Sequence, residues 1–138
     1  MALSIHSALN GVLLTGHRYV TDTGANSGVM DWTKPSTVYA FDIVNQKYLQ
    51  NRRLLAFADT GIPDGIHTDT QGNIFSSCNG GGLQVWNPDG VLLGKILIQG
   101  STANFAFVPD GLLLFVEDRL WLVRMKARGR DIKRDFGI

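Results

Sequence analysis

The chain has 138 residues and a formal net charge of +1, with 18% of its residues charged. This length suits one ordinary domain, and the balanced charge excludes strong electrostatic steering toward nucleic acid or an anionic membrane surface. No apolar run approaches the roughly 20 residues of a transmembrane helix, and the first residues lack the basic start and apolar run of a signal peptide. As written, the chain is expected to be cytoplasmic, although an upstream leader lost from the sequence would change this.

Glycine content and the shape of the apolar runs favour an all-β fold. The sequence has 16 glycines, its apolar runs are short, and few stripes are long enough for a helix. The single cysteine, Cys78, excludes a disulfide within the chain. Because Cys78 lies in a run typical of a strand, we expect a small buried thiol there and not a nucleophile.

In chain order, the expected strands fall into three units separated by turn signals. Asn87-Pro88-Asp89-Gly90 and Pro109-Asp110-Gly111 are strong turn signals, and Pro63-Asp64-Gly65 predicts a tight turn where a loop enters a sheet. The expected strands span residues 9–14, 18–23, 37–43 and 54–57 in the first unit, 63–66, 73–78, 82–86 and 91–98 in the second, and 103–107, 112–116 and 120–123 in the third.

The units repeat at intervals typical of a β-propeller. Their leading polar residues are separated by 54 residues, from Asn10 to Asp64, and by 40 residues, from Asp64 to Asn104. Four-stranded sheets repeated at roughly 40 to 50 residues are the signature of propeller blades, and the first strand of each blade lines the central channel. The three side chains are therefore expected to face one axis, where carboxylate and amide oxygens suit a hard cation such as calcium. For Asn10 and Asn104, the competing interpretation is a turn in which the side-chain amide forms a hydrogen bond with the nearby backbone.

Several motifs in consistent order resemble a known family. They are Tyr-Val-Thr-Asp-Thr-Gly-Ala at 19–25, Asn-Arg-Arg at 51–53, Gly-Ile-Pro-Asp-Gly-Ile at 61–66, Gly-Asn-Ile at 72–74 and Val-Trp-Asn-Pro-Asp-Gly at 85–90. Over roughly residues 8 to 125, the chain resembles the second half of a fungal-type gluconolactonase. On these motifs it is identified as a member of the SMP-30/gluconolactonase/LRE-like family, also called the senescence marker protein or regucalcin family.

This resemblance implies a six-bladed propeller that hydrolyses sugar lactones with one divalent metal, Ca²⁺, Zn²⁺ or Mn²⁺, at the mouth of the channel. Asp64 matches a ligand aspartate of the family, and Asn10 matches a ligand asparagine, although Leu9 stands where the family has proline. The other two family ligands have no counterpart here. Asp64 is also the candidate catalytic residue that would take a proton from the attacking water. Asn104 rests on the repeat alone, and His67 is a candidate channel-lining residue.

The length favours a partial fold. A six-bladed propeller needs about 270 residues at about 45 per blade, so this chain would supply about three blades, the C-terminal half. The expected fold class is therefore an all-β partial propeller over residues 1–125, followed by a basic, disordered tail over residues 126–138. The lactonase interpretation then describes a fragment that is incomplete or impaired as an enzyme.

Two alternatives remain open at this point. In the first, the chain is a non-catalytic module that binds calcium or assembles, and two copies pair as a homodimer that completes the ring of blades. In the second, the basic tail contacts nucleic acid or acidic lipid. Six of the thirteen basic residues lie between Arg124 and Arg134, but Asp131 and Asp135 dilute them and favour a solvated tail. The expected partner is therefore a sugar lactone, and neither nucleic acid nor a membrane.

Overall fold

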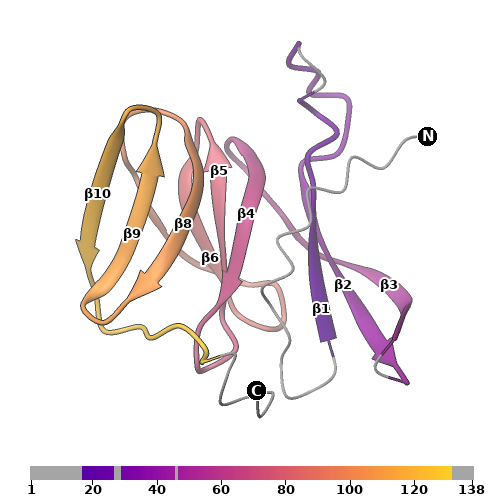
Figure 1. Cartoon of the computed structure of the whole chain (residues 1–138). Helices are drawn as coiled ribbons and strands as arrows, with labels where there is room; N and C mark the ends of the chain where they lie inside the picture. The colour runs from indigo at the N-terminus through magenta and orange to yellow at the C-terminus, as the bar shows by residue number, and fades with distance from the viewer. Residues whose placement is uncertain (1–16, 27–28, 46, 132–138) are drawn as a thin grey trace.

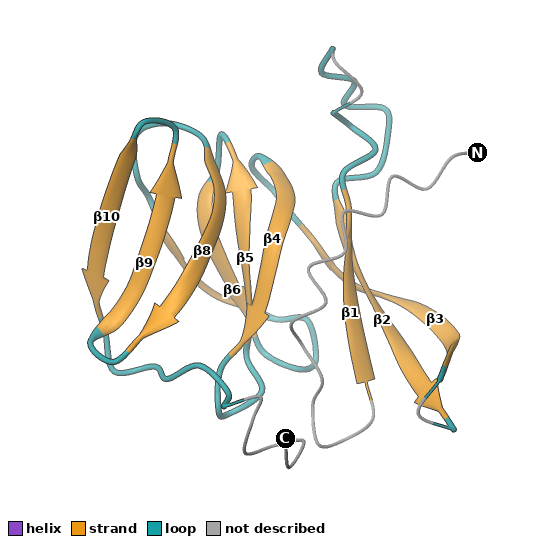
Figure 2. Cartoon of the chain, viewed as in Figure 1, coloured by secondary structure: helices purple, strands orange, loops and turns teal. Residues whose placement is uncertain are grey.

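The computed structural model describes residues 17–26, 29–45 and 47–131, and the regular elements in these ranges are all β-strands (Figure 2). Within these ranges, no helix is long and apolar enough to cross a membrane. The ten strands, in chain order, are β1 (His17–Asp22), β2 (Thr37–Val44), β3 (Tyr48–Phe57), β4 (Ile62–Thr68), β5 (Ile74–Asn79), β6 (Gly82–Trp86), β7 (Leu92–Ile96), β8 (Thr102–Val108), β9 (Gly111–Val116) and β10 (Arg119–Arg124).

The strands form three antiparallel sheets that lie side by side (Figure 1). The strand orders are β1-β2-β3, β4-β5-β6-β7 and β8-β9-β10, so each sheet is a meander of sequence neighbours. The predicted all-β partial propeller is confirmed, with each sheet as one blade. The strands predicted for the second and third units are present, whereas the first strand predicted for the first unit, at 9–14, lies outside the described residues.

Two hydrophobic clusters hold neighbouring sheets together. One joins the first and second sheets through Tyr19, Val38, Ala40, Ala56, Ala58, Ile66, Ile74, Cys78 and Trp86. The other joins the second and third sheets through Phe75, Leu83, Phe105, Leu112, Leu114 and Val116. β5 contributes to both clusters, because successive side chains of a strand point to opposite faces of its sheet. The contacts between blades therefore bury apolar side chains, and such burial stabilises the fold by about 25 cal/mol per Å² of apolar area.

Cys78 belongs to the first of these clusters and is fully buried. Desolvation by burial raises the pKa of its thiol to about 12, and the nearby carboxylate of Asp59 acts in the same direction. A thiolate is the reactive form of cysteine, so this thiol stays unreactive at neutral pH. The expectation of a small buried thiol is confirmed.

After β10, the chain runs back toward the second sheet. An isolated bridge pairs Gly129 with Asp69, which lies in the turn between β4 and β5. The segment predicted as a tail from residue 126 is described through residue 131, and residues 132–138 lie outside the described part of the chain.

Candidate functional site

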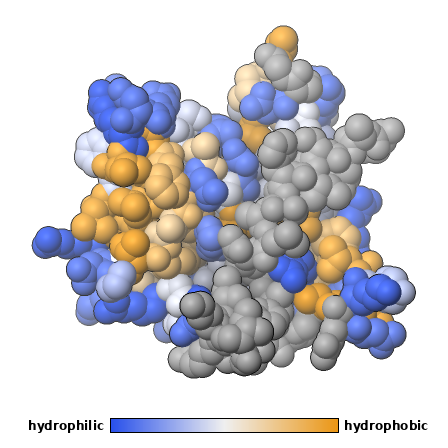
Figure 3. All heavy atoms as spheres, viewed as in Figure 1, coloured by the Kyte–Doolittle hydropathy of each residue, from blue (hydrophilic) through white to orange (hydrophobic). Residues whose placement is uncertain are grey.

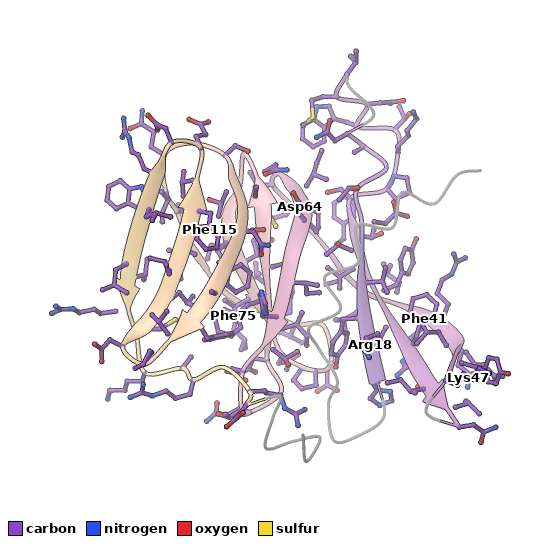
Figure 4. The ribbon with its side chains drawn as sticks, viewed as in Figure 1. Arg18, Phe41, Lys47, Asp64, Phe75 and Phe115 are labelled. Atoms are coloured by element: carbon purple, nitrogen blue, oxygen red, sulfur yellow. The ribbon has the colours of Figure 1, made fainter. Side chains whose placement is uncertain are left out.

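Asp64 lies near the start of β4, within a β-bulge (Figure 4). Pro63 pairs with Cys78 and Ile66 pairs with Ser76, so two residues of β4 stand opposite one residue of β5. The tight turn predicted for this Pro-Asp-Gly segment is therefore wrong, because the segment lies inside a strand. The extra residue of a bulge bends the strand and re-aims a side chain, which is why bulges recur beside functional sites.

The bulge is held from the sheets on both sides. Within the second sheet, the backbone N–H of Gly65 donates to Ser77 Oγ over 2.9 Å. Ser77 Oγ in turn donates to the carbonyl oxygen of Ala103 on β8 over 2.8 Å. From the first sheet, Thr21 Oγ1 donates to the carbonyl oxygen of Asp64 over 2.9 Å. The backbone that carries the Asp64 carboxylate is thus fixed by hydrogen bonds that reach three blades.

The sequence contains Pro-Asp-Gly three times, and only one copy lies in a strand. The other two copies, with Asp89 and Asp110, form the β6–β7 and β8–β9 turns. Because antiparallel strands alternate in direction, these turns lie at the end of the sheets opposite to Asp64. The flanking residues Ile62 and Ile66 are both buried, and this draws the first copy into the sheet. Asp89 and Asp110 are exposed, whereas Asp64 is half-buried.

One oxygen of the Asp64 carboxylate accepts a hydrogen bond from a neighbouring side chain. Its Oδ2 accepts a long hydrogen bond of 3.3 Å from Asn79 Nδ2. Asn79 Oδ1 in turn accepts a 3.0 Å hydrogen bond from Ser101 Oγ. Among the described residues, none donates a hydrogen bond to Asp64 Oδ1. A half-buried carboxylate oxygen with free lone pairs is the kind of donor that a hard cation binds.

The described residues fit part of a site for a divalent cation. Ranges 17–26, 29–45 and 47–131 contain no group of three or more His, Cys, Asp and Glu side chains that could hold a metal. What lies together is one carboxylate, Asp64, with the amide of Asn79 and the hydroxyl of Ser101 beyond it. Asn79 turns its amide nitrogen toward Asp64, so the ligand atom that these residues offer is a carboxylate oxygen of Asp64, and such an oxygen suits Ca²⁺ or Mn²⁺ better than Zn²⁺. Asn10, the second predicted ligand, lies outside the described residues.

The third sheet carries the same kind of bulge as the second. Thr102 pairs with Val116 and Asn104 pairs with Phe115, which leaves Ala103 as the extra residue of β8. The first strands of the second and third sheets, β4 and β8, therefore both bend at the same end of their sheets.

The register of these bulges makes Ala103 the equivalent of Asp64, because the carbonyl of each accepts a hydroxyl from the preceding sheet. The two residues lie 39 positions apart, one fewer than the predicted spacing from Asp64 to Asn104. Asn104 is instead the equivalent of Gly65, and its exposed side chain caps its neighbour, because Oδ1 accepts the backbone N–H of Phe105 at 2.8 Å. Its role as a channel-lining residue stays a prediction.

His67 lies three residues beyond Asp64 on β4 and faces the third sheet. Its ring meets Phe105 edge-on, with ring centroids 4.8 Å apart and an interplanar angle of 74°. Desolvation by burial lowers the pKa of His67, and a hydrogen bond with the backbone of Phe105 partly opposes this shift. The imidazole is therefore neutral at neutral pH. Contact of His67 with a substrate stays a prediction.

Sequence reasoning missed Thr21, Asn79 and Ser101. Thr21 reads as an ordinary strand residue, and Asn79 stands before three glycines, where an asparagine signals a turn. Ser101 stands in the segment between β7 and β8. Thr21 and Ser101 approach the site through packing between sheets, and Asn79 approaches it through the pairing of β5 with β4, so no local pattern could have found them.

Comparisons with known proteins agree with this architecture. Residues 19–117 match the family model described as SMP-30/Gluconolactonase/LRE-like region. The chain is 29% identical over 119 residues to the lactonohydrolase oryL of Aspergillus oryzae, which covers 76% of this chain and 26% of that protein. It is 38% identical over 72 residues to the gluconolactonase of Zymomonas mobilis, which covers 49% of this chain and 19% of that protein.

A solved structure that is assigned as a gluconolactonase superposes on this chain with a TM-score of 0.73 and 26% sequence identity. The superposition covers 88% of this chain and 40% of the solved chain. The chain thus spans well under two thirds of the lengths of the relatives that it matches.

Proposed function

Since residues 19–117 match its model, the chain belongs to the SMP-30/gluconolactonase/LRE-like family, and on that premise we propose that it takes part in the hydrolysis of sugar lactones. The observation that carries the proposal is the carboxylate of Asp64. It is held at a bulge at one end of the sheets, where Oδ2 accepts a hydrogen bond from Asn79 and Oδ1 accepts none from the part of the chain that the structure describes. The names of the relatives support a lactone as the substrate class.

We propose Asp64 as a ligand of one divalent cation, Ca²⁺ or Mn²⁺, with Zn²⁺ less suited to an all-oxygen site. When bound, such a cation polarises a lactone carbonyl and stabilises the negative charge that develops on its oxygen as water attacks. A carboxylate that binds a cation is a weaker base, so we assign Asp64 the role of ligand ahead of that of general base. Its backbone, fixed by Thr21 and Ser77, keeps the carboxylate in place without a new ordering cost.

Further donors are needed beyond Asp64. The described residues contain no group of three or more His, Cys, Asp and Glu side chains that could hold a metal, and a calcium site takes 6–8 oxygens. We propose that Asn10 or a partner copy provides protein donors. With fewer donors the chain would bind the cation weakly and turn over slowly.

The third sheet supports a second proposal, a homodimer. Leu120 pairs with Phe115 and Leu122 pairs with Leu113, so these side chains share one face of the sheet. Leu120 is 66% exposed and Leu122 is 52% exposed. Figure 3 shows apolar surface over β8, β9 and β10. In a propeller that face is covered by the next blade. We propose a second copy as its occupant.

The assembly proposal is tested by the mass of the purified chain in solution. Light scattering should give twice the monomer mass of 15.1 kDa, and Leu120→Lys should return the mass to that of the monomer. A stable, folded monomer at high concentration would contradict the homodimer. A dimer without lactone turnover would favour the non-catalytic binding module.

The enzymatic proposal is tested by acid release from glucono-δ-lactone. The purified chain is first treated with EDTA, and then Ca²⁺, Mn²⁺ or Zn²⁺ is restored singly, with the spontaneous rate measured alongside. We expect turnover with Mn²⁺ or Ca²⁺ and a slower rate with δ-valerolactone, which lacks the sugar hydroxyls. No turnover above the spontaneous rate, from a chain that circular dichroism shows to be folded, would contradict the proposal.

A further inference from the structure

A line of polar groups leads from Asp64 across two blades. Asn79 Nδ2 donates to Asp64 Oδ2 over 3.3 Å, and Ser101 Oγ donates to Asn79 Oδ1 over 3.0 Å. The backbone N–H of Ser101 donates to Glu117 Oε1 over 3.1 Å. The four residues come from β4, the end of β5, the segment before β8 and the β9–β10 hairpin. They all lie at the same end of the sheets (Figure 1).

Each link in this line has a defined direction. An asparagine amide nitrogen can only donate and its oxygen can only accept, so Asn79 must turn its NH₂ group toward the carboxylate of Asp64. Ser101 favours that orientation, because its hydroxyl donates to Asn79 Oδ1. The position of Ser101 is set in turn by Glu117, on a hairpin where the backbone of Glu117 has a φ of 51°.

We propose that Asn79 is a positioning residue for Asp64, and that Ser101 fixes which end of the Asn79 amide faces the carboxylate. Asn79 engages Oδ2 and so directs Oδ1 to the cation. The third blade then reaches the site through Ser101, since its own equivalent of Asp64 is Ala103, which has no donor side chain. This inference rests on the proposed cation site at Asp64.

The size of the expected effect follows from how such contacts act elsewhere. Residues that hydrogen-bond a metal ligand typically change metal affinity by about 10- to 100-fold when they are removed. The Asn79 contact is long and half-buried, so we expect the low end of that range, about 10-fold. Because Ser101 acts through Asn79, its removal should add nothing once Asn79 is gone.

The first test is a titration of the full-length chain with Mn²⁺, followed by electron paramagnetic resonance. Asn79→Ala and Ser101→Ala should each weaken binding, Asn79→Ala by about 10-fold, and the double variant should match Asn79→Ala alone. The matched control is Asn87→Ala. Asn87 Oδ1 accepts the backbone N–H groups of Asp89 and Val91 in the turn at the opposite end of the same sheet. This control should lower stability without changing Mn²⁺ affinity.

The second test needs no metal, which separates this inference from the proposed function. The side-chain NH₂ resonances of Asn79 should shift, and exchange faster with solvent, in both Asp64→Ala and Ser101→Ala, while those of Asn87 stay unchanged. If the chemical shifts and exchange rates of the Asn79 NH₂ group are unchanged in Asp64→Ala, the inference is overturned. Additive losses of Mn²⁺ affinity in the double variant would overturn the role of Ser101. A wild-type chain that binds no Mn²⁺ but shows the Asn79 shifts would contradict the proposed cation site and would still support the contact between Asn79 and Asp64.

Discussion

The Thr21 hydroxyl donates a 2.9 Å hydrogen bond to the backbone carbonyl of Asp64 and so ties the first sheet to the bulge that carries the candidate ligand. The next pair of sheets repeats this arrangement, with Ser77 donating to Ala103. In both cases a hydroxyl on one sheet satisfies a carbonyl that the bulge withdraws from its own ladder. The blades are thus joined by a repeated polar contact as well as by their apolar clusters.

Thr21→Val should therefore lower the free energy of unfolding by about 1 kcal/mol, because it leaves the Asp64 carbonyl without its donor and keeps the shape of the side chain. Chemical denaturation measures this change. Thr33→Val is the matched control, since Thr33 donates only to Asp31 on an exposed excursion. Equal losses of unfolding free energy in the two variants would show that the hydrogen bond between the sheets contributes no more to stability than the exposed one.

Gly65→Ala should be destabilising by about 1 to 3 kcal/mol through overpacking. A Cβ at Gly65 on β4 would overlap Asn104 Oδ1 and come within 3.1 Å of Asn104 Cα on β8. To make room, β4 and β8 must move apart. Gly94→Ala is the control, because a Cβ there has nothing within 4 Å. A melting temperature that falls for Gly65→Ala and not for Gly94→Ala is the expected result, and the same shift for both would contradict the packing argument.

Cys78 should resist labelling in the folded chain. Burial raises the pKa of its thiol to about 12, so almost no thiolate exists at pH 8, and the thiol is shielded as well. A chromogenic disulfide reagent should react with Cys78 only after denaturant is added. Rapid stoichiometric labelling under native conditions would mean that the first and second sheets open readily.

His67 should make stability fall as the solution becomes acidic. Its pKa is ordinarily near 6.5 and is lowered in the folded chain by desolvation, so the unfolded chain takes up the proton first. The contribution is fully present above about pH 6.5 and is lost as pH falls toward the folded pKa. His67→Phe keeps an aromatic side chain against Phe105 and cannot be protonated. Between pH 7 and 5 the variant should lose less stability than the wild type, and parallel curves would contradict this assignment.

Much of the fold could be predicted from the sequence, because the turn signals are local. Alternating apolar residues and the turns at Asp89 and Asp110 placed the strands of the second and third units. The bulge at Asp64 could not be predicted in this way. All three Pro-Asp-Gly segments have the same turn chemistry, and the burial of Ile62 and Ile66 distinguishes the one that lies in a strand.

The candidate site could be predicted only in part, because local patterns and repeat spacing do not reveal bulges or contacts between strand ends. The position of Asp64 near the start of a first strand follows from the repeat. The one-residue offset that puts Ala103 in its place in the third sheet depends on a bulge, which leaves no mark in the spacing of polar residues. The contact with Asn79 depends on where two strands end, and the order of residues alone does not specify it.

The central claim is that Asp64, of the three Pro-Asp-Gly aspartates, binds the cation that assists lactone hydrolysis. The most direct measurement compares the Mn²⁺-dependent rate of glucono-δ-lactone hydrolysis in Asp64→Ala with that in Asp89→Ala and Asp110→Ala, all shown to be folded. We predict that Asp64→Ala loses the metal-dependent rate while the other two variants keep it, because they alter exposed turns at the far end of the sheets. A metal-dependent rate that survives in Asp64→Ala would contradict the account.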